Sequence, residues 1–338
     1  MIHDEFPGVA LHNVAETTTA PWNPDGHRLR RTPAALGRAL NVDARERMGH
    51  PTNCELRFVP ETDEATVRVT VSAQARTVLH PFWGDFQGEE PVEFGPVPKT
   101  IELSVPERIG ELDDRVETGA FDPHVCRLRF DAWEPVAVHD VAGACRPPTD
   151  DELPDHRYLA HGTSITEGAA ASAAHLTYVS RVARRLGVDP INLGASGSAF
   201  CEPAMAEYIG DRDDWDVATL ALSVNMANRG FTEKQFDERV QNFVRTVAEA
   251  HPEKPVVCVT LFSYHEDLVQ DGDRERAAAL RSSLRSAVDR CETENVHLVE
   301  GPDLMNATGL TTDLLHPGDV GMEAIGAGLA DAVGPLLD

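Results

Sequence analysis

Three residue types that together perform acyl transfer occur far apart in this chain. Ser164 lies in the segment His161–Gly168, between a short apolar run and a helical pattern. A serine on such a strand-to-helix turn can act as a nucleophile, because a helix N-terminus offers unpaired N–H groups to a developing oxyanion. Near the other end of the chain, His316 supplies a base and Asp313 a carboxylate to orient it. This set predicts a serine hydrolase.

The elements that must position these residues follow from the pattern after about residue 156. Strands are expected at 158–161, 191–194, 217–224, 255–262 and 296–299, and helices at 176–186, 232–250, 274–291 and 320–337. The strands are apolar without alternation and are separated by helices, which favours a parallel sheet covered on both faces. Sites in such sheets form beyond the carboxyl ends of the strands.

Four segments fall at that edge of the expected sheet. They are Ser164, the run Asn192–Ser198, the run Ser223–Met226, and the loop Asp313–His316. An acyl-transfer site also needs fixed donors for the oxyanion. We expect these donors to be the backbone N–H groups of Ser164 and Gly197 and the side-chain amide of Asn225. Glycine at position 197 also permits a close backbone approach to the reacting carbon.

The first 145 residues have a different pattern. Segments 54–59, 65–71, 100–105 and 125–130 alternate apolar and polar residues, which predicts half-buried strands, with 60–64 as a turn and 36–40 as a brief helix. We therefore predict an antiparallel β-sandwich domain over residues 1–145. The polar, proline-containing stretch that follows predicts a linker over 146–155, and the catalytic domain is expected over 156–338.

Each motif has a structural alternative when taken alone. The glycines around Ser164 and Gly197 could mark ordinary tight turns, Asn225 could be a helix cap, and Asp313 could simply precede the last helix. The order of the motifs, each at a strand end, favours catalysis. His265 follows the fourth strand and is a candidate to line the pocket. Trp83 lies in an aromatic segment that is expected either to pack in a core or to form an exposed lid that stacks on sugars.

The four segments, in this order, resemble the SGNH (GDSL-type) hydrolase superfamily over about residues 155–338. Ser164, Gly197 and Asn225 fall on its first three motif blocks, and Asp313 with His316 on the last. The runs 162–166, 191–197 and 224–226 are similar to the subfamily with an N-terminal β-sandwich domain. The resemblance implies a flavodoxin-like, three-layer α/β/α sheet, hydrolysis or transfer of an ester acyl group, and no cofactor.

Two motifs depart from the superfamily pattern. The usual Gly-Asp-Ser-Leu is here Gly162-Thr163-Ser164-Ile165, and the usual Gly-x-Asn-Asp is Ser223-Val224-Asn225-Met226. The second change removes an aspartate that would support the loop. We expect an esterase acting on a small-molecule acyl ester, with an acetylated carbohydrate as one candidate. The alternatives are an acyltransferase that uses the same acyl-enzyme and a non-catalytic glycan-binding protein. The sequence does not specify acyl length, alcohol or oligomeric state.

The composition indicates the solvent conditions, the partners and the cellular location to expect. The formal charge is −26, from 56 acidic and 30 basic residues, and the only lysines are Lys99, Lys234 and Lys254. An acidic, lysine-poor surface is typical of a halophilic protein that stays dispersed in strong salt, although an ordinary acidic protein is the alternative. This charge argues against nucleic acid and anionic membranes as partners. The six cysteines lack metal-ligand spacing. No secretory signal or spanning segment is evident, so a cytoplasmic location is expected.

Overall fold

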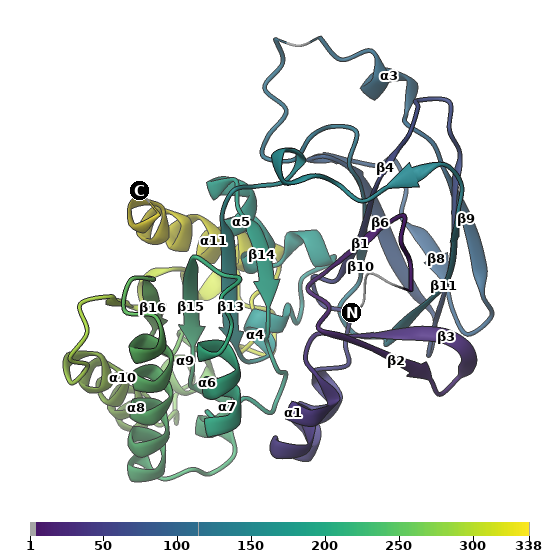
Figure 1. Cartoon of the computed structure of the whole chain (residues 1–338). Coiled ribbons are helices and arrows are strands. Elements are labelled where there is room, and N and C mark those ends of the chain that lie inside the picture. Colours follow the sequence, from purple (N-terminus) through teal and green to yellow (C-terminus); the bar gives the residue numbers. More distant parts are fainter. Residues whose placement is uncertain (1–4, 114, 338) are drawn as a thin grey trace. The chain divides into compact units, whose positions relative to one another are not determined.

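The computed structural model of the chain describes residues 5–113 and 115–337. The chain divides into two compact units, whose elements are labelled in Figure 1. The first unit comprises Met1–Ala34, Gly49–Asp155 and Gly187–Asp189, and the second comprises Ala35–Met48, His156–Leu186 and Pro190–Asp338. Residues 1–4, at the segment for which no secretory signal is expected, lie outside the described residues. Within the described ranges, no helix is both long and apolar enough to cross a bilayer.

Two antiparallel sheets make up most of the first unit. One has the order β1-β4-β10-β6-β7, with β12 beside β4 and β8 beside β6, and the other has the order β2-β3-β11-β5-β9. Apolar side chains from both sheets, among them Leu56, Phe58, Val69 and Leu128, form one buried core. The predicted N-terminal β-sandwich is therefore confirmed. The strands are β1 (Ala10–His12), β2 (Glu16–Ala20), β3 (Asn23–Arg30), β4 (Glu55–Pro60), β5 (Val67–Ala73), β6 (Thr77–Trp83), β7 (Phe86–Gln87), β8 (Val92–Phe94), β9 (Lys99–Leu103), β10 (Cys126–Phe130), β11 (Val136–Ala142) and β12 (Cys145–Arg146), and the short helix is α3 (Glu107–Gly110).

Strand β4 differs from the half-buried strand expected over 54–59. The alternation is real, because Leu56 and Phe58 belong to the apolar core while the charged Glu55 and Arg57 alternate with them. The charged face is nevertheless buried too, and every residue of β4 is buried. The prediction of a solvated face was wrong because these charges pair with one another, which is the condition for burying them.

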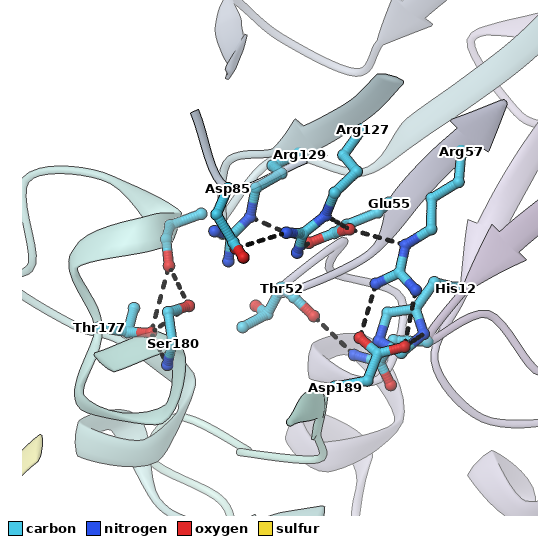
Figure 2. Close-up of polar contacts among 12 residues, drawn as sticks. His12, Thr52, Glu55, Arg57, Asp85, Arg127, Arg129, Thr177, Ser180 and Asp189 are labelled. Carbon is cyan, nitrogen blue, oxygen red and sulfur yellow. Dashed lines mark hydrogen bonds and ion pairs between the residues drawn. The ribbon is translucent and has the colours of Figure 1, made fainter. Parts of the chain in front are cut away.

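A buried ion cluster, defined here as Glu55, Arg57, Arg127, Arg129 and Asp189, occupies this face (Figure 2). Glu55 accepts two hydrogen bonds of 2.8 Å from Arg127 and one of 2.8 Å from Arg57, and Arg129 Nε lies 3.0 Å from it. Arg57 also binds the Asp189 carboxylate bidentately at 2.6 and 2.7 Å. Burial raises the pKa of Glu55, but the charges of Arg127, Arg57 and Arg129 outweigh burial and hold it well below its usual range.

Two segments of the amino-terminal half differ in detail from the expectation. The brief helix expected over 36–40 is α1 (Ala34–Ala39), and a second helix, α2 (Val42–Arg47), follows it. Residues 35–48 belong to the second unit, although the chain returns to the first unit at Gly49. The stretch expected as a linker is ordered, since Arg146 pairs with Glu152 at 2.6 Å in a short helical turn.

A five-stranded sheet in the order β14-β13-β15-β16-β17 organises the second unit, counted over the described residues. The pairs from β13 to β17 are parallel, and the order is the flavodoxin-like one. Its elements are β13 (Arg157–Gly162), α4 (Ser164–Glu167), α5 (Tyr178–Leu186), β14 (Asp189–Asn192), α6 (Pro203–Gly210), β15 (Val217–Ala221), α7 (Val224–Asn228), α8 (Glu233–Ala250), β16 (Val256–Val259), α9 (His265–Leu268), α10 (Arg274–Asp289), β17 (Val296–Val299) and α11 (Asp319–Val333).

Helices cover both faces of this sheet (Figure 1). Helices α6 and α10 both pack against α8, and the apolar side chains of the three helices share a core with Leu220 and Cys258 of the sheet. Helix α5 packs against α11. The expected three-layer α/β/α fold is confirmed. The sequence did not indicate α6, and the strand expected to reach residue 224 ends at Ala221, because Val224 already begins α7.

Candidate active site

Ser164 is the first residue of α4 and follows β13 after one intervening residue. The turn is very tight: a Cβ atom on Gly162 would lie 2.3 Å from Thr166 Oγ1 and 2.8 Å from the Ala221 carbonyl. Only glycine fits such a close approach without displacing backbone. The turn therefore places Ser164 at the carboxyl edge of the sheet, where it is 4% exposed.

His316 links the serine to a carboxylate. Its Nε2 lies 2.8 Å from Ser164 Oγ, and its Nδ1 lies 2.6 Å from Asp313 Oδ2. Since a carboxylate only accepts, the network assigns the proton to Nδ1 and leaves Nε2 free to accept the serine hydroxyl proton. This is the arrangement in which a histidine acts as a general base toward a serine.

The loop that carries this pair is held by its own hydrogen bonds. Asp313 Oδ1 accepts the N–H groups of Leu315 and His316 at 2.9 and 3.0 Å and the Thr311 hydroxyl at 2.7 Å. Partial burial raises the pKa of Asp313, but the hydrogen bonds from His316, Thr311 and Leu315 outweigh burial and hold this pKa below its ordinary value. Leu314 adopts a left-handed conformation, with φ of 53°, so the loop is strained at its tip.

Gly197 lies on the loop after β14 and Asn225 lies on α7, and a hydrogen bond joins these two segments. Gly197 has φ of 68°, which favours glycine. Asn225, 7% exposed, accepts the N–H of Ala199 through Oδ1 at 3.1 Å. Its amide NH₂ is therefore directed away from that contact and is available to a developing oxyanion.

Two residues to which sequence analysis assigned no role tie the nucleophile turn to the Gly197 loop. Glu167, fully buried at the end of α4, accepts the Ser196 N–H at 2.6 Å. Asn192 donates to the Thr166 carbonyl at 2.7 Å and accepts the Gly194 N–H at 2.8 Å. Both lie within the motif segments named above, and a polar side chain next to apolar residues was the signal that could have identified each of them.

The aspartate missing after Asn225 is replaced by a contact from elsewhere in the chain. Arg276, on α10, donates to the Phe231 carbonyl at 2.6 Å and to the Ala227 carbonyl at 3.3 Å. These carbonyls end the segment that contains α7. The Arg276 guanidinium, which belongs to a different helix, thus holds the segment that the usual aspartate would support.

The remaining candidate residues have separate locations. His161 is buried, donates through Nδ1 to the Leu193 carbonyl at 2.9 Å, and stacks on Phe243, so it supports the sheet edge. His265 begins α9 and contacts Tyr264, and its role in a pocket stays a prediction. Trp83 is 4% exposed in the core of the sandwich and does not form an exposed loop.

A small hollow of about 10 Å³ adjoins the nucleophile turn. That volume holds about one water molecule. Within the described part of the chain, no group of three or more histidine, cysteine or acidic side chains is arranged to hold a metal ion. The hollow is lined by Thr163, Ile165, Ala221, Ser223, Val224, Thr260, Leu261 and Phe262.

Comparisons with known proteins agree with this geometry. The model of the GDSL-like lipase/acylhydrolase family matches residues 156–337. A salicylyl-acyltransferase from a tetracycline biosynthetic pathway superimposes with a TM-score of 0.78 at 17% identity, covering 97% of this chain and 95% of that one. No curated protein matches the sequence.

Two carbohydrate esterases of family two have the same fold. The enzyme from Cellvibrio japonicus gives a TM-score of 0.64 at 13% identity, covering 98% of this chain and 96% of that one. An active-site mutant of the Clostridium thermocellum enzyme gives 0.63 at 14% identity, covering 97% and 98%. At such identities, the likeness shows a shared fold alone.

Proposed function

Because the chain belongs to the GDSL-like lipase/acylhydrolase family, we propose that it is a serine esterase that cleaves a small acyl ester by double displacement. The observation that carries this proposal is the continuous chain of hydrogen bonds from Ser164 Oγ through His316 to Asp313, at 2.8 and 2.6 Å. A serine is a weak nucleophile unless a base takes its proton, and this chain supplies that base with its tautomer fixed.

The residues would act in two half-reactions. Ser164 Oγ attacks the ester carbonyl carbon while His316 Nε2 takes the hydroxyl proton, and the tetrahedral oxyanion accepts hydrogen bonds from Gly197, Asn225 and the Ser164 N–H. The bond to the alcohol oxygen then breaks, and His316 gives its proton to the departing alcohol. Water attacks the acyl-enzyme as His316 removes one of its protons. The bond between the acyl carbon and Ser164 Oγ then breaks, His316 returns that proton to Oγ, and the carboxylic acid leaves.

A short acyl group on a carbohydrate is the substrate class we propose. Two of the structures that share the fold over nearly the whole chain are carbohydrate esterases. The mechanism needs a small-molecule ester and no cofactor.

Acyl transfer is the second candidate function. The observation that favours it is the TM-score of 0.78 with an acyltransferase over 97% of this chain. The acyl-enzyme would be the same, and a hydroxyl acceptor would replace water in the second half-reaction. Product analysis with and without an added sugar or alcohol acceptor separates the two functions, because only transfer yields a new ester.

Labelling with a fluorophosphonate tests the proposed nucleophile. We expect stoichiometric labelling of the wild-type protein, none of Ser164→Ala, and unchanged labelling of Ser282→Ala, which removes an exposed serine on α10. Short-chain aryl esters and acetylated sugars, assayed in potassium chloride, then define the substrate. A wild-type protein that neither reacts with the label nor cleaves any ester would contradict the proposal and favour an inert, glycan-binding role.

A further inference from the structure

Residues 35–48 come from the amino-terminal half of the chain but form part of the unit that contains the candidate active site. Leu40, Ala44 and Met48 are buried in the same apolar core as Leu193 and Leu222, which lie just beyond the strands β14 and β15. This packing fixes the segment in place beside the loops that follow these strands. Because the segment is anchored by this packing, its polar side chains can hold those loops in a fixed position.

Asn41 uses both ends of its side-chain amide. Its oxygen accepts the Ala44 N–H at 3.0 Å and so caps helix α2. Its NH₂ group donates to the Ser198 carbonyl at 2.8 Å and to the Glu202 carboxylate. From the same segment, Arg47 Nε donates to the Ser196 carbonyl at 3.4 Å. The carbonyls on both sides of Gly197 are thus held by residues 41 and 47.

These carbonyls matter because a peptide group is planar and trans, so its C=O and N–H point in opposite directions. The Ser196 carbonyl shares a peptide with the Gly197 N–H, and the Ser198 carbonyl shares one with the Ala199 N–H. The Ala199 N–H donates to Asn225 Oδ1 at 3.1 Å. A continuous chain therefore runs from the Asn41 NH₂ through the 198–199 peptide to the amide of Asn225.

We infer that Asn41, with a weaker contribution from Arg47, positions the oxyanion donors Asn225 and Gly197. The inference rests on the proposed function, because it concerns donors that act on an ester-derived oxyanion. Asn41 orients the peptide that fixes which end of the Asn225 amide faces the reacting group, and Arg47 orients the Gly197 N–H. Hydrogen bonds in such a chain polarise one another, which strengthens the terminal donor.

Substitutions of Asn41 can separate its two roles, which are donation to the Ser198 carbonyl and capping of helix α2. Serine and aspartate both cap a helix as well as asparagine does, but neither supplies the NH₂ group. Asn41→Ser removes the donors. Asn41→Asp also places a carboxylate opposite the Ser198 carbonyl and Glu202. Thr232→Ala is the matched control, because Thr232 caps α8 by accepting the Gln235 N–H at 3.2 Å.

The measurements are kcat and KM on a short aryl ester and the rate of fluorophosphonate labelling. Removing an oxyanion donor costs about 10²–10³-fold in kcat, so Asn225→Ala is the reference. Misplacing a donor costs less, and we expect kcat and the labelling rate to fall about tenfold in Asn41→Ser and further in Asn41→Asp. We expect KM to change less than about twofold, as for an interaction made only in the transition state.

The double variant Asn41→Ser/Asn225→Ala excludes a merely structural role. Since Asn41 acts through Asn225, most of its effect should vanish once Asn225 is gone, whereas general destabilisation would persist. An unchanged kcat in Asn41→Ser, a rise in KM alone, or an undiminished loss in the double variant would each overturn the inference. If Asn41→Ser fails to fold while Thr232→Ala folds, Arg47→Met gives the same test through Gly197. A wild-type protein that resists labelling would instead defeat the proposed function and the inference together.

Discussion

Two carboxylates in this protein are held in the charged form by different means. Glu55 in the sandwich has a fully buried side chain and is surrounded by three arginines. Asp313 in the α/β unit has a side chain that is 48% exposed, and its donors are backbone N–H groups, a hydroxyl and one histidine. The pKa of each lies below its usual value, but the cause differs.

The difference shows what each arrangement can do. Permanent guanidinium charges surround Glu55, so none of these three arginines exchanges a proton with it near neutral pH. Around Asp313, neutral donors fix the carboxylate, and the one titratable partner is His316. That histidine can gain and lose a proton while its orientation stays constant, which is the property that general-base catalysis requires.

The largest expected effect comes from removing the residues that react with the ester. We expect Ser164→Ala or His316→Ala to lower kcat by roughly 10⁴–10⁶-fold, and the double variant to be hardly worse, because triad members act as a unit. Stopped-assay kinetics and thermal melts on the same preparations measure both quantities. Additive losses in the double variant would contradict the action of Ser164 and His316 as a unit, and a melting temperature that falls with activity would attribute the loss to unfolding.

The second prediction concerns the buried ion cluster and the stability of the sandwich. Glu55→Gln keeps the shape but removes the negative charge that three arginines share, although Arg57 keeps its contact with Asp189, and we expect a loss of about 3–5 kcal/mol in the free energy of unfolding. Glu93→Gln, which removes the exposed partner of Arg76, is the control and should change the free energy by about 0–1 kcal/mol. Denaturant titration compares the two variants, and equal effects would contradict the role given to the cluster.

The dependence of stability on acid pH tests the role of Glu55 in a second way. Because the pKa of Glu55 is lower in the folded protein than in the unfolded chain, its stabilisation is fully present above the unfolded value of about 4.3 and is lost as pH falls toward the folded value. Glu55→Gln lacks this dependence. We therefore expect wild-type stability to decline more steeply than that of Glu55→Gln below about pH 4.3, and parallel acid limbs would contradict this assignment.

Much of the fold and of the candidate site could be predicted from sequence, because the signals are local. Ser164, Gly197 and Asn225 each follow an apolar strand, so a parallel sheet brings them to one edge. Asn41 could not be predicted, since its partner Ser198 lies 157 residues away. An asparagine before a helix is also fully explained as a cap, which hides its second contact.

The buried cluster escaped prediction for a related reason. Alternating charges such as Glu55 and Arg57 in a strand are typical of a solvated face, and only tertiary packing reveals that the face is covered. The same pattern recurs at Arg127 and Arg129. Since pairing between distant strands decides whether such charges can be buried, periodicity alone indicates the strand but not its environment.

The smallest expected effect concerns salt. The net charge of −26 repels itself at low ionic strength, and the screening length falls from about 30 Å at 0.01 M to about 3 Å at 1 M. We propose that the protein is halophilic and expect its melting temperature to rise with potassium chloride. Glu55→Gln should show the same rise, because buried pairs are screened little. A flat or falling midpoint would contradict the halophilic reading.

The excursion of residues 35–48 also has a consequence for the order of folding. These residues leave the ribosome long before Pro190–Asp338, with which they pack. A segment whose partners are so distant in sequence pays a large loop-closure entropy and docks late. Until then Leu40, Ala44 and Met48 remain exposed on the nascent chain. The loop that carries Gly197 therefore acquires this support only after residues 193–222 have been synthesised, which makes competence for catalysis a late event in folding.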